Sequence, residues 1–281
     1  MSSSMESPIS PTQRAASRVP QEILDKIFQY AQDHTPSLLV CSLVCRAWLS
    51  ASRFRLFKRH FIHDRDLYKL SRLLKSPHAT LARYIRCLAV GSEILVGKHI
   101  WPLPQFPSLE ILRLSNTHIF SSHHPSQIVI HEKFPTITSL VLWYIIFDTF
   151  EQCTAILSSL PRLEHLALLS VHVGSSRSGV KPNTRDSGLS LRSFSIERCL
   201  LAEWFTWLLT FDPIPPLRTI RVGNPGPTYN LQDDNNLTRL FGQLSQSLGP
   251  NLESIYCDEF FIPIMQNGGY HNSHISTSVF N

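Results

Sequence analysis

Four histidines of this 281-residue chain gather in one segment and have the side chain that most often binds a metal ion: His118, His123, His124 and His131. A metal site needs a compact set of ligands, usually with Cys or acidic residues at closed spacing. His123 and His124 are adjacent and lie among Ser and Pro residues, where they make a poor ligand pair. We therefore expect a solvated loop here, and neither a metal site nor a cofactor.

The cysteines are scattered along the chain: Cys41, Cys45, Cys87, Cys153, Cys199 and Cys257. The polar N-terminus has no signal-like apolar segment, and no run of 18 apolar residues could span a membrane. We expect a cytoplasmic and/or nuclear protein whose thiols stay reduced and mostly buried. No glycine-rich phosphate loop, G-x-S-x-G elbow or grouped nucleophile, base and acid is present, which predicts a non-catalytic protein.

Basic residues far outnumber acidic ones between Arg53 and Lys98, although the net charge of the whole chain is only +5. The basic residues that alternate with aromatic and aliphatic ones are Arg53, Arg55, Lys58, Arg59, Arg65, Lys69, Arg72 and Lys75. A solvated helical linker or contact with an acidic protein explains this pattern most simply. Binding of nucleic acid is a less economical alternative.

Around this segment, hydrophobic residues make up 43% and charged residues 17% of the chain, which is typical of a soluble protein with a core. Residues 1–17 are Ser-rich and polar, so they are predicted to be disordered. Apolar residues then recur at helical spacing and predict an amphipathic helix from about Pro20 to Tyr30. The stretch LLVCSLVCRAWLSAS is hydrophobic almost all round and predicts a buried helix over 37–51. A further short helix is predicted to carry Leu56, Phe57 and Phe61.

From about residue 80, a short phrase recurs, as in PSLEILRL (107–114) and PRLEHLAL (161–168). Its second apolar position falls at Leu88, Leu112, Leu140, Leu166, Phe194, Ile220 and Ile255. Such a period indicates stacked repeats, and the alternation within each copy predicts a strand. Helical spacing in 147–160, 200–211 and 234–248 predicts helices between strands, with Trp204 and Trp207 in the core.

One strand and one helix per unit predict an α/β leucine-rich-repeat solenoid with a parallel concave sheet and helices outside. Regular repeats place Asn or Cys three residues after the last strand leucine, and only Cys199 conforms here. We therefore expect an irregular solenoid with long loops at 120–133 and 174–188. On its concave face, the residues predicted to bind a protein substrate are Arg113, Trp143, Glu197, Arg221, Tyr256 and Asp258, beside Ser115, Val141, Ala167, Leu169 and Ser195.

Residues 18–61 resemble an F-box, a helical domain of ubiquitin-ligase subunits. The matching residues are Pro20, Glu22, Ile23, Leu24, Ile27, Phe28, Val44, Cys45, Arg46, Trp48, Leu56 and Phe57, while Val19 replaces the usual Leu. F-box proteins with C-terminal leucine-rich repeats are a familiar architecture. The expected organisation is a disordered tail (1–17), an F-box of three helices (18–61), a basic helical linker (62–79), repeats (80–264) and a flexible tail (265–281).

The resemblance implies docking on a Skp adaptor, which connects to a cullin and a RING protein, and substrate binding by the repeats. The residues expected to face the adaptor are Pro20, Ile23, Leu24, Ile27, Val44 and Trp48, although Ile27 and Trp48 are also candidates for the domain's own core. The first hypothesis is a substrate receptor of an SCF-type ligase. The alternatives are an adaptor-binding factor outside any ligase and a nucleic-acid-associated protein.

Overall fold

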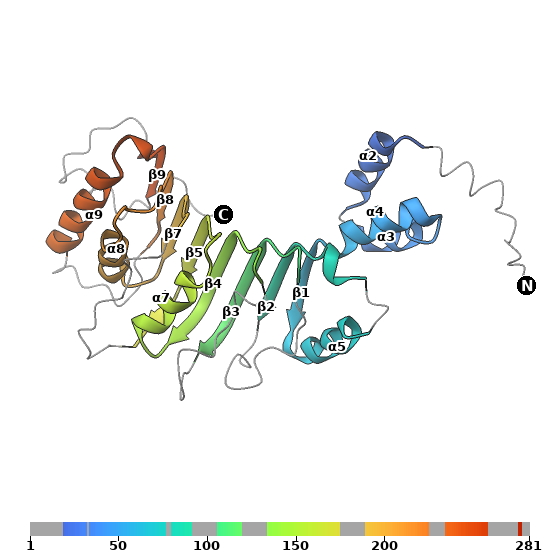
Figure 1. The fold of residues 1–281 in the computed structure, drawn as a ribbon, viewed down its shortest axis with the longest axis horizontal. Helices are drawn as coiled ribbons and strands as arrows, with labels where there is room; N and C mark the ends of the chain where they lie inside the picture. Colours follow the sequence, from blue (N-terminus) through green and yellow to red (C-terminus); the bar gives the residue numbers. More distant parts are fainter. Residues whose placement is uncertain are drawn as a thin grey trace, which may run out of the picture.

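The computed structural model describes residues 19–32, 34–76, 80–91, 106–119, 134–174, 189–224, 234–257 and 275–276. Three helices form the N-terminal part, and a long parallel sheet with helices between its strands forms the rest (Figure 1). This arrangement confirms the α/β fold class predicted from the sequence, in which N-terminal helices precede alternating strands and helices.

The N-terminal part consists of α2 (Gln21–Ala31), α3 (Thr35–Cys41) and α4 (Arg46–Phe57). Helix α2 begins and ends close to the predicted positions. Pro20 precedes its first turn, and the Pro20 carbonyl accepts hydrogen bonds from the amides of Ile23 and Leu24, each at 3.1 Å. Proline is well suited to this place because its missing N–H would have no helical partner there.

The single helix predicted over residues 37–51 is wrong, because a turn separates α3 from α4. The Ser42 hydroxyl donates a hydrogen bond to the Leu39 carbonyl at 2.6 Å, and such a bond competes with a continuing helix. Cys45 then adopts an extended backbone with φ of −160° before α4 begins. The separate third helix is also wrong, since Leu56 and Phe57 lie on α4 and Phe61 lies on a strand.

All strands of the sheet pair in parallel, and almost every strand lies beside the next one in the chain. Their spatial order is β1 (Arg59–His63), β2 (Cys87–Gly91), β3 (Ile111–Ile119), β4 (Ser139–Phe147), β5 (His165–Leu169), β7 (Ser193–Glu197), β8 (Thr219–Val222), β9 (Ser254–Cys257) and β10 (Ile275–Ser276). The short strand β6 (His172–Val173) pairs with β4 instead.

The repeated sequence phrase aligns in space as it does in sequence. Each residue of the series from Leu88 to Ile255 pairs in register with the next member of the series. Strand β1 extends this ladder at one end, where His60 pairs with Leu88, and β10 extends it at the other. The sequence predicts neither of these two strands, and β10 falls within the segment 265–281 that was expected to be flexible.

Among the described residues, the helices that accompany the sheet are α5 (Asp64–Leu74), α7 (Phe150–Ser158), α8 (Leu201–Leu209) and α9 (Asp234–Leu248). The last three match the predicted helical segments and lie along one face of the sheet (Figure 1). Alternate residues of β2, β3, β4, β5, β7 and β8 are buried in one continuous core with these helices. Trp204 and Trp207 are fully buried in it, which confirms their predicted core role.

Three residues with left-handed backbone occupy equivalent positions, one within β4 and the other two directly after β5 and β7. They are Tyr144, Ser170 and Arg198, with φ of 51°, 53° and 53°. Each left-handed residue interrupts the alternation, so that the residue after it, for example Ile145, turns into the core. Cys199 occupies this core position after Arg198, and its Sγ accepts a hydrogen bond from the Val171 amide at 3.3 Å.

The connection between the N-terminal helices and the sheet is short. Strand β1 begins at Arg59, inside the segment assigned to the F-box, and directly follows the end of α4. Helix α5 lies in the predicted linker 62–79, but Leu70 and Leu74 of this helix are buried in the sheet core. The predicted loops at 120–133 and 174–188 fall outside the described residues, apart from Gly174.

Candidate functional site

The N-terminal helices enclose a small core of their own. Leu24 and Phe28 of α2 and Leu38 of α3 are buried at its centre. Trp48 of α4 packs against them, with its ring edge-on to Phe28 at a centroid distance of 5.6 Å. Such a contact adds about 0.5–1.5 kcal/mol to the burial of the two rings.

The same helices carry exposed apolar side chains that the small core does not use. On α2, the exposed side chains are Ile23, Ile27 and Tyr30, which recur at helical spacing and so share one side. On α3 and the following turn, Leu39, Val40, Leu43 and Val44 are exposed. We call these seven residues the apolar docking surface. Exposed apolar groups this numerous on one small domain indicate a site for a protein partner.

The predicted adaptor-facing residues divide into two groups. Pro20, Ile23, Ile27 and Val44 are exposed, as contact with a partner requires. Leu24, by contrast, is only 3% exposed and belongs to the core, and Trp48 is partly buried against the same core. Leu24 therefore offers little surface to a partner, and Trp48 offers only part of its side chain.

Sequence reasoning missed four members of the docking surface: Tyr30, Leu39, Val40 and Leu43. The stretch from Leu38 to Val44 was interpreted as buried because it is apolar on all sides. The structure instead buries Leu38 and leaves Leu43 84% exposed. A domain of about 40 residues cannot bury every side chain of so apolar a stretch. This excess of apolar residues was the signal that some of them are exposed.

Polar contacts tie α4 to the start of the sheet. Arg53 donates a hydrogen bond to the Thr80 hydroxyl at 3.2 Å, and Arg83 donates one to the Tyr84 hydroxyl at 2.7 Å. Burial raises the pKa of Tyr84, but hydrogen bonds with Ser50 and Arg83 and the charges of Arg83 and Arg53 outweigh it, so the net pKa is lowered. The three-residue 3₁₀ helix η1 (Ala82–Tyr84) thus anchors α4 beside β2.

The sheet face opposite the helices carries the predicted substrate-binding residues. Arg113 and Trp143 are exposed there, while Glu197, Arg221 and Tyr256 are half-buried. Their smaller neighbours Val141, Ala167, Leu169 and Ser195 are half-buried, and Ser115 is buried. Asp258 lies outside the described residues. We call this the open face.

Aromatic contacts shape two places on the open face. The guanidinium of Arg221 lies 4.6 Å from the centroid of the Tyr256 ring, its partner in the strand register. The rings of Trp143 and Tyr144 have centroids 5.7 Å apart, and both remain largely exposed. The left-handed backbone at Tyr144 brings its side chain out of the sheet core and next to Trp143.

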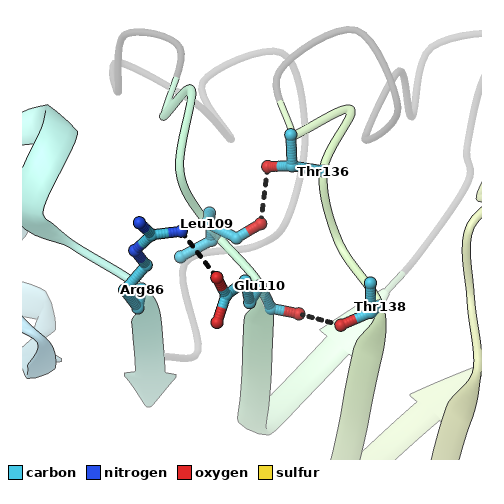
Figure 2. A network of polar contacts seen from close by, with 5 residues as sticks. All are labelled: Arg86, Leu109, Glu110, Thr136 and Thr138. Carbon is cyan, nitrogen blue, oxygen red and sulfur yellow. Dashed lines mark hydrogen bonds and ion pairs between the residues drawn. The ribbon is translucent and has the colours of Figure 1, made fainter.

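A row of charged and polar residues precedes the strands. Figure 2 shows the Arg86–Glu110 ion pair at 2.6 Å, together with the hydroxyls of Thr136 and Thr138, which donate to the carbonyls of Leu109 (2.7 Å) and Glu110 (3.4 Å). Further along the same row are the ion pairs Glu164–Arg192 at 3.9 Å and Arg218–Glu253 at 3.1 Å. Exposed ion pairs of this kind contribute only about 0–1 kcal/mol each to the free energy of folding, so this row adds little to the stability of the sheet.

The described part of the chain has no group of three or more His, Cys, Asp or Glu residues that could hold a metal ion. All six cysteines are free thiols. Burial raises the pKa of Cys153 well above its usual range, and it raises the pKa of Cys199 to about 11 against opposing backbone hydrogen bonds. Such thiols are unreactive at neutral pH. None of the described helices has the length and apolar character needed to cross a membrane.

Comparison with known proteins supports the assignment of the N-terminal helices. Residues 16–63 match the model of the F-box-like family, a range that includes α2, α3 and α4 and ends with β1. No curated protein matches the chain at a significant level. The chain therefore contains an F-box-like domain at residues 16–63, followed by an α/β region built on parallel strands.

Proposed function

We propose that this protein is a substrate-recognition subunit of an SCF-type ubiquitin ligase. The F-box-like domain docks on a Skp adaptor, through which a cullin and a RING protein are recruited. The stacked strand–helix units act as leucine-rich repeats, and their open face holds a protein substrate. The chain supplies no chemistry of its own, because the partner proteins carry out the transfer of ubiquitin.

The observation that carries this proposal is the apolar docking surface on a domain that matches the F-box-like family. Leu43 is 84% and Tyr30 92% exposed in the free chain. Full burial of one aliphatic side chain against a partner contributes about 1.5–3 kcal/mol. A surface of seven such residues is therefore costly to leave in water and suited to a stable, permanent partner.

The register of the repeats supports the second half of the proposal. The recurring phrase places its last two apolar residues, for example Leu112 and Leu114, in the core and the residue between them on the open face. Successive units can therefore vary their open-face residues without disturbing the core. This is how repeat proteins build extended binding surfaces.

Co-expression of the full-length chain with a Skp adaptor and a cullin tests the proposal. We expect one stable complex of the three proteins, and we expect the double variant Val40→Asp, Leu43→Asp to lose it, because charges cannot be buried in an apolar interface. Leu73→Asp on α5 is the matched control, since Leu73 is also an exposed leucine (51%) but lies outside the docking surface.

The possible results discriminate between functions. Loss of the complex in the double variant alone supports docking through this surface. Retention of the adaptor without the cullin indicates a factor that acts outside a ligase. Failure of the wild-type chain to bind the adaptor contradicts the proposal.

A further inference from the structure

Two arginines occupy equivalent positions on the open face, at a fixed separation. The strand register runs from Arg113 of β3 through Val141, Ala167 and Ser195 to Arg221 of β8. The three intervening side chains are shorter than the arginines. The surface formed by these three side chains is therefore lower than the arginine side chains on either side of it, and we call it the floor of the open face.

Each arginine has a defined setting. Arg221 lies against the Tyr256 ring at 4.6 Å, which restricts its guanidinium before any ligand binds and lowers the entropic cost of binding. Arg113 is exposed, and its neighbours Leu112 and Leu114 are fixed in the core on either side. The backbone of both arginines is thus fixed by strands of the sheet, as a specific site requires.

An apolar anchor point lies beside this floor. Trp143 follows Val141 by two residues on the same face of β4, and it is 51% exposed. Its register partner on β5 is Leu169, and Tyr144 lies at its edge. Exposed tryptophans on a rigid support are frequent energetic centres of protein interfaces.

Charge determines which partner fits. Among the described residues of the open face, the acidic side chain is Glu197, which packs over Gly223 and has its carboxylate 3.7 Å from Arg198. Arg113 and Arg221 contribute positive charge to the same face. Because each is a single guanidinium and not a cluster, it suits one carboxylate better than a phosphate dianion.

We propose that the open face binds an extended acidic protein segment, with two carboxylates on Arg113 and Arg221 and an apolar or aromatic side chain between them on Trp143. The two arginines are separated by four strand steps of ~4.8 Å, or ~19 Å, and an extended chain covers that distance in about six residues at ~3.3 Å each. The inference deepens the proposed function, since this segment would belong to the substrate. Binding does not require the adaptor, so either idea can fail without the other.

Selection from a phage-displayed library of random peptides about twelve residues long, panned on the full-length chain, tests the proposal. We expect enrichment of peptides with two Asp or Glu residues about six positions apart and an aromatic or aliphatic residue between them. Basic peptides, or no enrichment over a surface without protein, would overturn it. So would a synthetic peptide whose binding requires phosphoserine in place of Glu.

Variants of the chain then locate the binding site of the best peptide. Arg113→Glu, Arg221→Glu and Trp143→Ala should each weaken binding at least about tenfold in fluorescence anisotropy. A peptide with Lys in place of the matching acid should regain affinity for Arg221→Glu, which a merely misfolded variant would not show. Arg239→Glu on α9 is the control with the same charge change on an exposed helix residue, and it should bind within about twofold of wild type. Equal affinity in all these variants would contradict the site.

Discussion

At the scale of single residues, Leu24 and Leu43 show how one domain uses the same side chain for two purposes. Leu24 is 3% exposed and packs with Phe28 and Leu38. Leu43 is 84% exposed and contributes to the docking surface. The first therefore stabilises the fold and the second is available to a partner.

Substitution by alanine separates these two roles. Leu24→Ala should lower the free energy of unfolding by about 2–5 kcal/mol, because it leaves a cavity in a small core. Leu43→Ala should change that free energy by less than about 0.5 kcal/mol, because its side chain is already in water. Urea denaturation of the full chain measures both, and an equal loss in the two variants would show that Leu43 is buried in the folded protein.

Gly174 is a residue whose lack of a side chain is required by close backbone packing. Its amide donates to the Phe147 carbonyl at 2.9 Å, and a Cβ at this position would lie 2.4 Å from the Asp148 carbonyl oxygen. Gly174→Ala should therefore destabilise the protein by about 1–3 kcal/mol, since the backbone must shift.

Gly242 provides the matched control in thermal or chemical unfolding. It lies within α9, and a Cβ there meets nothing within 4 Å. Gly242→Ala should raise the free energy of unfolding by about 0.5–1 kcal/mol because alanine is the better helix former. A loss of stability in both variants would mean that the space around Gly242 is filled.

At the scale of secondary-structure elements, the strands of the repeat units are predictable from the sequence. The equivalent apolar residue of each unit must pair with that of the next unit for the strands to stack in register. The residues from Leu88 to Ile255 therefore pair as the aligned phrase predicts. Strand β1, with the sequence RHFIH, contains no copy of that phrase and was missed. The sequence does not predict the turn between α3 and α4, because the exposed residues of this stretch are as apolar as the buried ones, which removes the helical period.

Helices α7 and α8, which follow β4 and β7, bring two acidic residues together. Glu151 and Glu203 lie in the first turns of these helices, and burial followed by repulsion from Glu151 raises the pKa of Glu203. A carboxyl whose pKa is higher in the folded state binds its proton more tightly there. Glu203 therefore lowers stability once the pH rises above its ordinary pKa of about 4.3, and not below it.

Glu203→Gln removes this charge without changing the shape of the side chain. We expect the variant to be more stable than wild type at pH 7 and the difference to shrink as the pH falls toward about 4. Urea denaturation at several pH values measures the effect. Glu253→Gln, which breaks the exposed pair with Arg218, should show no such gain at pH 7. A gain that does not depend on pH would exclude the charge of Glu203 as its cause.

At the scale of the whole molecule, α4 belongs to both parts of the chain. Leu56 packs against the core of the F-box-like domain, and the next residue, Phe57, packs against the core of the sheet. Lys58 then leads directly into β1, and its carbonyl accepts hydrogen bonds from the amides of Arg86 (3.1 Å) and Cys87 (2.8 Å). Only Lys58 separates α4 from β1, and residues of α4 pack against both cores, so we expect the docking surface and the open face to keep a constant relative orientation.

This continuity predicts that the two parts unfold together. Leu24→Ala, although it lies in the F-box-like domain, should reduce the protection of the Leu88 and Val90 amides of β2 in native-state hydrogen exchange, because the sheet cannot keep its first strand when α4 is lost. Insertion of a short Gly-Ser segment between Lys58 and Arg59 separates the parts, and in that background Leu24→Ala should leave β2 unaffected. If Leu24→Ala has no effect on β2 even without the insertion, the parts open independently, and a substrate on the open face would not be presented at a fixed position relative to the adaptor.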